Sequence, residues 1–230
     1  MLSRAAVQSV TPRPLPRGAA REVPSIGPCA FAGSVELTSA SLSFLRNAEI
    51  YGEREPADYF YKVVSGAVRT YRVLIDGRRQ IAAFYMPGDF FGLETGDEHA
   101  FSAEAVVDAR VMAIKRKTVV SLAARDNEVA RQLWKLAGIE LERTQNHVLL
   151  LVKTAPERVA SFLLEMAERI RSSDEVELPM SRQDVADYLG LTIETVSRML
   201  TRFETASAIA LPSTKRIVLH NRAVLERLIA

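Results

Sequence analysis

The spacing of hydrophobic residues differs between two parts of the chain, an earlier part in which they alternate and a later part in which they recur every three or four residues. Between about residues 31 and 115, short runs of alternating apolar and polar side chains are interrupted by turns such as Ser65-Gly66 and Asp76-Gly77. A period of two is typical of strands that bury one face, and Asp-Gly between such runs favours a hairpin. The alternating runs cover residues 58–64, 67–74, 80–85 and 101–113. Short strands at this spacing predict an antiparallel β-sandwich or β-roll over residues 31–124.

The period changes in the segment from Asp126 to Lys153, which has no proline and one glycine, Gly138. Apolar or small residues recur there in steps of four and three, which is the heptad pattern of a coiled-coil seam. These seam residues are Ala130, Trp134, Ala137, Leu141, Thr144, Val148 and Leu151. We predict a long helix over residues 125–153 that pairs with a second copy of the chain.

The alternative is that this helix lies on its own β domain. A neighbouring face of the helix could make that contact while the seam pairs with a second chain. This face consists of Leu133, Leu136 and Leu150.

The two ends of the chain differ in character. Residues 1–30 carry five prolines and no hydrophobic period, which is typical of a flexible tail. After the long helix, Thr154-Ala-Pro-Glu157 has the pattern of a capping box with an early-turn proline, so a new helix is expected from Pro156 to about Arg171. Residues 154–230 form the third predicted unit.

Two short helices joined by a tight turn are predicted between Ser181 and Thr205. Ser181 and Thr192 can cap the two helices, and Gly190 can end the first because glycine tolerates a positive φ. The expected inward faces consist of Val185, Ala186 and Leu189 in the first helix and Val196, Leu200 and Phe203 in the second. This arrangement is a helix-turn-helix, whose second helix enters the major groove of DNA.

The outward side chains of the second helix are the candidate contacts to DNA. Expected base contacts are Ile193, Glu194, Ser197 and Arg198. Expected phosphate contacts are Arg182, Thr192, Thr195, Arg202, Lys215 and Arg216. Lys215 and Arg216 lie at the tip of a predicted hairpin wing, residues 208–219, and Asn221 can cap a last helix. The alternative is a structural dimer module in which Glu194 and Arg198 form only a surface ion pair.

Composition adds few constraints. The chain has 230 residues, 48% of them hydrophobic, and a net charge of +2, so a DNA-binding surface must come from the arrangement of charges. A single cysteine, Cys29, excludes an intrachain disulfide and favours the cytoplasm; an inert thiol is expected, and oxidation or cross-linking is the alternative. No apolar run is long enough to span a membrane and no secretory signal is visible, so no membrane partner is expected. Motifs of the common enzyme classes are missing, which argues against an enzyme.

The motifs together resemble the Crp/Fnr superfamily of bacterial regulators over about residues 37–230. The resemblance rests on Val64-Ser-Gly-Ala-Val68, Asp76-Gly77, Pro87-Gly-Asp-Phe-Phe-Gly92, the long helix and the helix-turn-helix. It implies an α+β fold with an N-terminal antiparallel β-roll of the cyclic-nucleotide-binding type, a dimerisation helix and a C-terminal winged helix-turn-helix.

Within this superfamily, Glu194-Thr-Val-Ser-Arg198 resembles the recognition helix of the FixK-like branch. The resemblance implies a homodimer that reads a TTGAT-N4-ATCAA-like palindrome and activates transcription through RNA polymerase, in low-oxygen or nitrogen-fixation gene control. By the same resemblance, residues 172–175 and 74–79 are candidate polymerase contacts.

The β-roll departs from the ligand-binding members that it resembles. Phe101 stands where those members carry an arginine for a cyclic phosphate, and only Ser102 could supply the expected hydroxyl. Acidic residues nearby would repel a phosphate, and the three histidines form no visible haem or metal set. We expect no cofactor, no metal and a β-roll without a bound effector, with His147 a polar residue of the dimer interface. A ligand-gated regulator with an unknown effector is the alternative.

Overall fold

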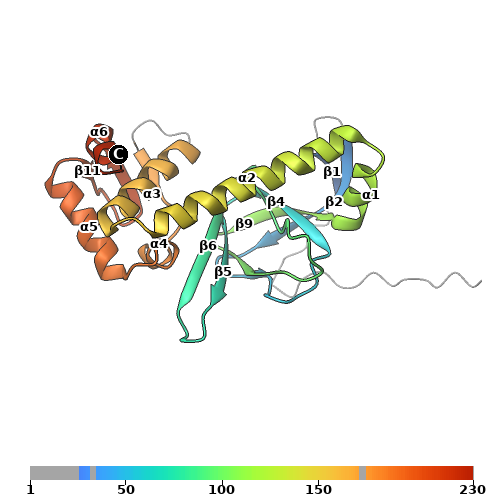
Figure 1. Ribbon diagram of the computed structural model, residues 1–230, viewed down its shortest axis with the longest axis horizontal. Coiled ribbons are helices and arrows are strands. Elements are labelled where there is room, and N and C mark those ends of the chain that lie inside the picture. Colours follow the sequence, from blue (N-terminus) through green and yellow to red (C-terminus); the bar gives the residue numbers. More distant parts are fainter. Residues whose placement is uncertain (1–25, 32–34, 171–174, 230) are drawn as a thin grey trace, which may run out of the picture.

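The computed structural model describes residues 26–31, 35–170 and 175–229, with side chains from residue 39 onward. A long helix, α2 (Asn127–Leu151), runs from a β domain to a smaller helical domain (Figure 1). Within the described residues, none of the helices combines the length and apolar character needed to cross a membrane.

The N-terminal domain consists of two antiparallel sheets. The first has the order β1-β2-β9-β4-β7 and the second β3-β8-β5-β6. The strands are β1 (Ile26–Phe31), β2 (Val35–Phe44), β3 (Glu49–Tyr51), β4 (Tyr59–Ser65), β5 (Val68–Val73), β6 (Arg79–Tyr85), β7 (Phe90–Phe91), β8 (Ser102–Ala105) and β9 (Ala109–Lys115). Both sheets contribute to one buried core that includes Tyr61, Val68, Phe91 and Val111. The predicted antiparallel β-roll is therefore confirmed.

The predicted turns have a backbone that explains their glycines. Gly66 and Gly77 have φ values of +81° and +82°. At Gly66 a Cβ atom would also lie 2.4 Å from the carbonyl oxygen of Asp108, so only glycine fits there. The run predicted over residues 101–113 is two strands, β8 and β9, because the chain turns between them.

The expectation of a flexible tail through residue 30 is wrong at its last residues. Ile26 to Phe31 form β1, in which Cys29 pairs in register with Leu37 of β2. The strand lies at the edge of its sheet, a position in which proline is acceptable. Residues 1–25 lie outside the described part of the chain.

The predicted long helix is confirmed as α2, and Asp126 is its N-cap. The Asp126 side chain accepts from the backbone N–H of Glu128 at 2.8 Å. A short helix that was not predicted from the sequence, α1 (Arg116–Ala123), precedes it. Leu133 and Leu136 pack against a small core that joins α1, α2 and the β-roll, so one face of α2 does lie on its own domain.

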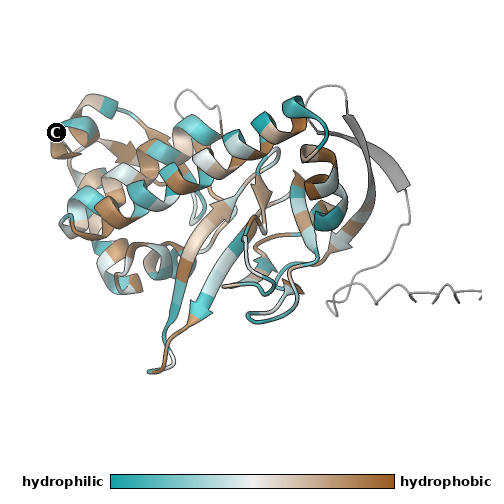
Figure 2. Ribbon diagram, turned by 45° about the vertical axis from the view of Figure 1, so that its right-hand side comes forward, coloured by the Kyte–Doolittle hydropathy of each residue, from teal (hydrophilic) through white to brown (hydrophobic). Residues whose placement is uncertain are grey.

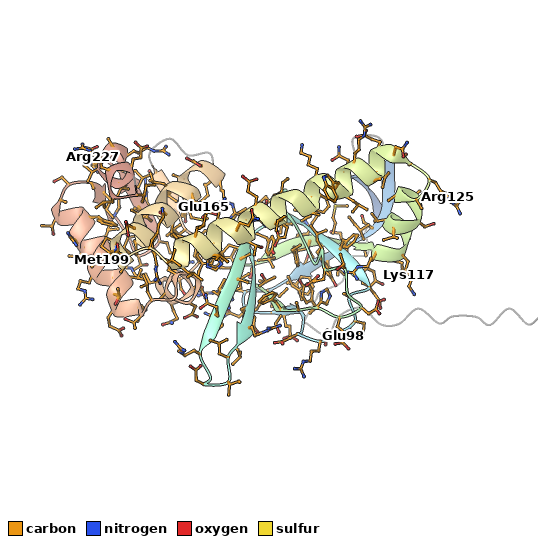
Figure 3. All side chains as sticks on the ribbon, in the orientation of Figure 1. Glu98, Lys117, Arg125, Glu165, Met199 and Arg227 are labelled. Carbon is orange, nitrogen blue, oxygen red and sulfur yellow. The ribbon has the colours of Figure 1, made fainter. Side chains whose placement is uncertain are left out.

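The C-terminal domain is a winged helix-turn-helix. Its elements are α3 (Ala155–Arg169), β10 (Glu175–Glu177), α4 (Arg182–Leu189), α5 (Ile193–Thr205), β11 (Ile209–Ala210), β12 (Arg216–Leu219) and α6 (Arg222–Ile229). The predicted wing is the β11–β12 hairpin, and β10 adds a third strand to it. Figure 3 shows Met199 of α5 at the opposite end of the molecule from Lys117 of α1.

Candidate nucleic-acid interface

Helices α4 and α5 form the predicted helix-turn-helix with its predicted caps. The Ser181 hydroxyl accepts from the backbone N–H of Asp184 at 3.1 Å, and the Thr192 hydroxyl accepts from that of Thr195 at 3.3 Å. Gly190 ends α4 in the left-handed region, at φ 61° and ψ 39°. Three residues, 190–192, therefore separate the two helices.

The two faces of α5 have opposite characters. Val196, Met199, Leu200 and Phe203 are buried against the rest of the domain. On the outward face, Glu194, Arg198, Thr192 and Arg202 are exposed, and Thr195 and Ser197 are half-buried. Ile193 is half-buried as well, but it packs against the domain core. The four expected base-contact residues thus lie in the first turns of α5.

Glu194 and Arg198 do not pair with each other. The ion pairs among the described residues do not include this one. Hydrogen bonds from the backbone N–H of Glu194 and from the Thr192 hydroxyl lower the pKa of the Glu194 carboxyl. The carboxylate is therefore ionised at the helix N-terminus, and the guanidinium of Arg198 extends into solvent.

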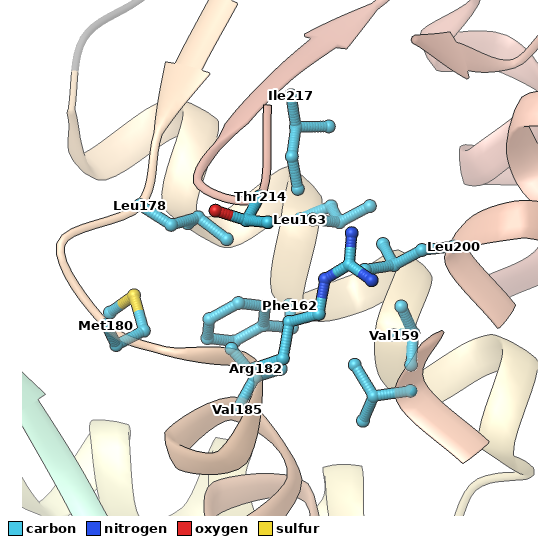
Figure 4. A pocket seen from close by; sticks show the side chains of 11 residues that line it. Val159, Phe162, Leu163, Leu178, Met180, Arg182, Val185, Leu200, Thr214 and Ile217 are labelled. Atoms are coloured by element: carbon cyan, nitrogen blue, oxygen red, sulfur yellow. The ribbon is translucent and has the colours of Figure 1, made fainter. Parts of the chain in front are cut away.

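Arg182 lies beside the N-terminal half of α5. Its Nη1 atom is 3.5 Å from the Ser197 hydroxyl oxygen. Figure 4 shows the side chain reaching across a small apolar hollow in the domain core, between Phe162 and Leu200. The aliphatic stem is thus packed, and the Nε atom of the guanidinium is buried without a hydrogen-bond partner.

The two basic residues of the wing are already engaged. Lys215 Nζ donates to the carbonyl oxygen of Pro179 at 3.2 Å. Arg216 Nη2 lies 2.7 Å from Glu175 Oε2, and this carboxylate raises the pKa of the Arg216 guanidinium. This partner was not predictable from the sequence, because Glu175 belongs to the short strand β10, which exists only through pairing with β12.

The central residues of the seam on α2 are exposed in the single chain. Trp134 is 82% exposed, and Leu141 and Val148 are each 59% exposed. Ala137 and Thr144 are also exposed, whereas Ala130 and Leu151 are half-buried. Figure 2 shows hydrophobic residues in brown recurring along this helix among hydrophilic ones in teal.

His147 is not a seam residue, which corrects the sequence-based expectation. Its Nε2 lies 2.8 Å from the carbonyl oxygen of Tyr188 in α4, and the two rings stack with centroids 4.1 Å apart. The residue occupies the face of α2 that is turned toward its own chain, so it joins the long helix to the helix-turn-helix.

A polar network fills the contact between the β-roll and α2. The Tyr85 hydroxyl donates to Glu140 Oε1 at 2.7 Å, and Arg143 lies 2.9 Å from Glu140 and 3.3 Å from Asp89. Asp89 also accepts from Arg169 of α3 at 2.7 Å. This one carboxylate therefore contacts both α2 and α3.

The segment of the β-roll that departs from ligand-binding relatives has its own internal contacts. The Ser102 hydroxyl oxygen accepts from the backbone N–H of Glu53 at 3.0 Å, and the ring of Phe101 lies 5.0 Å from the guanidinium of Arg72. His99 is buried and stacks on Tyr51 with centroids 3.5 Å apart. The described residues contain no cluster of three side chains able to hold a metal ion.

Comparisons with known proteins agree with this architecture. A cyclic nucleotide-binding domain family matches residues 41–126, and a Crp-like helix-turn-helix domain family matches residues 157–228. The nitrogen fixation regulation protein FixK of Azorhizobium caulinodans is 52% identical over 191 residues, which are 80% of this chain and 77% of that protein. FixK of Rhizobium meliloti is 40% identical, covering 85% of this chain and 88% of the relative.

Solved structures show the same relationship. The structure of FixK2 from Bradyrhizobium japonicum superposes with a TM-score of 0.82 at 49% identity, covering 84% of this chain and 98% of the other. A regulator of the CRP family from Thermus thermophilus superposes with a TM-score of 0.69 at 28% identity, covering 81% of this chain and 95% of the other. The chain belongs to the FixK-like branch of the Crp/Fnr superfamily of DNA-binding transcription regulators.

Proposed function

We propose that this chain is a cytoplasmic homodimeric activator that reads a TTGAT-N4-ATCAA-like palindrome in low-oxygen or nitrogen-fixation gene control. The observation that carries the proposal is the outward face of α5, where Glu194 and Arg198 lie one helical turn apart, exposed and not paired with each other. The relatives named as nitrogen fixation regulators support the biological context.

The chemistry of these two side chains fits base recognition. Arginine can hold guanine O6 and N7 with two hydrogen bonds, and a carboxylate can accept from cytosine N4. We assign these roles to Arg198 and Glu194, with Ile193 and Ser197 beside them. Each such contact contributes roughly 1–3 kcal/mol of discrimination between bases. Phosphate contacts are assigned to Arg182, Thr192, Thr195, Arg202, Lys215 and Arg216.

The exposed seam of α2 supports pairing with a second copy of the chain. An apolar stripe with a heptad period and an exposed Trp134 is typical of a coiled-coil interface. Two paired α2 helices would place the two helix-turn-helix units, called the reading heads below, at major grooves separated by one helical turn of about 34 Å. The palindromic symmetry of the proposed site matches this twofold arrangement.

We propose that the dimer binds DNA without an effector in the β-roll. Ser102 and Phe101 are engaged by Glu53 and Arg72, and side chains of Tyr85, Glu140 and Arg143 fill the contact with α2. The candidate contact to RNA polymerase is the β5–β6 hairpin, whose tip carries the fully exposed Ile75. The other candidate, residues 172–175, lies almost wholly outside the described residues.

The test is an anisotropy titration of purified, effector-free protein against a TTGAT-N4-ATCAA duplex and a scrambled duplex. The expected result is tight binding to the palindrome alone and a loss of about 10- to 100-fold for Arg198→Ala, which corresponds to one base contact. Arg125→Ala, at the far end of the molecule (Figure 3), is the matched control and should bind normally. A requirement for an added small molecule would reject effector-free binding.

A further inference from the structure

Helix α4 precedes the recognition helix α5 and packs against it. A buried ion pair holds α4 on the β-roll. Arg69 of β5 and Asp184 of α4 are 5% and 4% exposed, and Arg69 Nη1 lies 3.0 Å from Asp184 Oδ1. We propose that Arg69 and Asp184 form a latch that positions the recognition helix for simultaneous binding of both half-sites. This inference rests on the proposed dimeric recognition of a palindrome.

The latch residues have further partners that fix their geometry. Arg69 Nη2 lies 2.8 Å from Glu104 Oε1 and 3.3 Å from Asn47 Oδ1. These contacts within the β-roll orient the guanidinium toward α4. The other oxygen of Asp184 accepts from the backbone N–H of Ser181 at 3.0 Å and so belongs to the α4 cap. The ion pair therefore joins two locally rigid groups.

A second arginine strengthens the same contact. Arg79 of β6 places Nη2 2.6 Å from Asp184 Oδ1 and Nε 2.8 Å from Asp187 Oδ2. Two carboxylates of α4 thus face two guanidinium groups of the β5–β6 hairpin, 105 to 115 residues away in sequence.

The other end of α4 is held by donors to its last carbonyl groups. Tyr188 O accepts from Gln80 of β6 at 3.3 Å and from His147 of α2 at 2.8 Å. Leu189 O accepts from Arg158 of α3 at 2.8 Å. Three other parts of the fold therefore fix both ends of α4, and α5 follows because it packs on α4.

The docked position leaves the DNA-binding face open. Arg69 and Arg79 contact α4, whereas Glu194 and Arg198 lie on the outward face of α5 and remain exposed. The β-roll and the C-terminal domain also share one hydrophobic core, in which Ile81 and Phe84 cluster with Phe162 and Tyr188. A latch of this kind orients the reading head without covering it.

The orientation of the two reading heads affects the affinity for a palindrome. Once one head of the dimer is bound, the second head binds its half-site intramolecularly. Its effective concentration is high only when the two reading heads are held at the spacing of the half-sites. Fixing the heads in advance lowers the ordering cost of binding and sharpens the choice of spacing. Releasing the latch should therefore weaken binding to the palindrome and broaden spacer tolerance, with little effect on one half-site.

The test compares the variant Arg69→Met/Glu104→Gln with the wild type. The second substitution avoids leaving the Glu104 carboxylate buried without its partner, and neither residue belongs to the C-terminal domain. The control is Arg72→Met, because Arg72 lies on the same strand and pairs with Glu53 inside the β-roll at 3.1 Å. Each protein is titrated with N3, N4 and N5 palindromes and with a duplex that carries a single half-site.

We expect the variant to lose about tenfold in affinity for the N4 palindrome and most of its N4 preference, with half-site affinity changed by less than about twofold. The control should match the wild type. Equal losses on half-site and palindrome would overturn the proposal, because they indicate a damaged reading head. Unchanged or tighter palindrome binding would overturn it as well.

A calorimetric scan without DNA tests the latch independently of the proposed function. The wild type should unfold in one cooperative transition, with equal calorimetric and van't Hoff enthalpies. The shared hydrophobic core and the Arg79 contacts remain in the variant, so its domains should stay docked but be less tightly coupled, with a van't Hoff enthalpy below the calorimetric one. Equal enthalpies in a folded variant would overturn the latch. A wild type that shows no preference for the palindrome would instead contradict the proposed function, and the calorimetric result would still decide on the latch.

Discussion

The imidazole of His147 lies flat on the ring of Tyr188, with an interplanar angle of 7° and centroids 4.1 Å apart. Its Nε2 atom also hydrogen-bonds to the carbonyl oxygen of the same residue at 2.8 Å. Because a carbonyl oxygen can only accept, Nε2 must carry the hydrogen. One residue of the long helix thus contacts both the backbone and the side chain of the helix-turn-helix.

This burial predicts a pH dependence of folding stability. Desolvation lowers the pKa of His147 below its ordinary value of 6.5, although hydrogen bonds to the Tyr188 and Ala82 backbone and the charge of Glu165 oppose the shift. The unfolded chain therefore binds the proton first, and the stability that the neutral ring contributes is lost as pH falls from 6.5 through the lowered pKa. Chemical denaturation from pH 8 to pH 5 should show this loss, and His147→Gln should reduce it. An identical pH profile for both proteins would contradict the prediction.

Gly66 should be far less replaceable than Gly77, although their φ values of +81° and +82° are nearly equal. A Cβ atom at position 66 meets the Asp108 carbonyl oxygen at 2.4 Å, whereas nothing lies within 4 Å at position 77. Gly77→Ala should cost about 1–2 kcal/mol of unfolding free energy from backbone strain alone, and Gly66→Ala about 2–5 kcal/mol from strain and overlap together. Urea titrations of both variants measure the difference in unfolding free energy. Equal losses of unfolding free energy in the two variants would contradict the prediction.

Charge in the α2 seam should dissociate the proposed dimer. Trp134→Lys places an ammonium group in an apolar interface, and an uncompensated buried charge costs about 3–5 kcal/mol. Sedimentation equilibrium should show monomers at concentrations where the wild type is dimeric. Asn146→Lys introduces the same residue at an exposed position of α2 outside the seam and should remain a dimer. A dimeric Trp134→Lys protein would exclude this seam as the interface.

Neutralising Glu175 should tighten DNA binding. Its carboxylate pairs with Arg216 at 2.7 Å and competes with a DNA phosphate for this guanidinium. Because an exposed ion pair is weak, Glu175→Gln should raise affinity by up to about fivefold for all sequences alike. The slope of log affinity against log salt concentration should become steeper, by up to the amount expected for about one added phosphate contact.

Glu226→Gln carries the same change in net charge on the exposed surface of α6 and serves as the control. An equal gain in both variants would show that only net charge matters. A gain confined to Glu175→Gln identifies the release of Arg216 as the cause.

Features with a local cause were predictable from the sequence. The caps Ser181 and Thr192, the left-handed Gly190 and the heptad period of α2 each depend on neighbours within a few residues. Strand β10 was missed because it has three residues and exists only through pairing with β12. Strand β1 was missed because Pro28 suggested a tail, and proline is acceptable at a sheet edge.

The contacts between domains could not be predicted from the sequence. Periodicity indicates which face of a helix is apolar but not which element covers the other faces, so His147 was assigned to the dimer interface. Arg69 and Asp184 are 115 residues apart, and although Asp184 belongs to the α4 cap, no sequence pattern relates it to Arg69. Only the folded chain brings them together.

The exposed seam of α2 has a consequence for how the amount of active regulator depends on the amount of protein synthesised. If two chains must associate before either reading head is useful, the amount of active regulator at low expression rises with the square of the number of chains synthesised. A twofold rise in synthesis would then give close to a fourfold rise in promoter occupancy. A threshold of this kind lets the rate of translation act as the input signal, with no small molecule needed to sharpen the response.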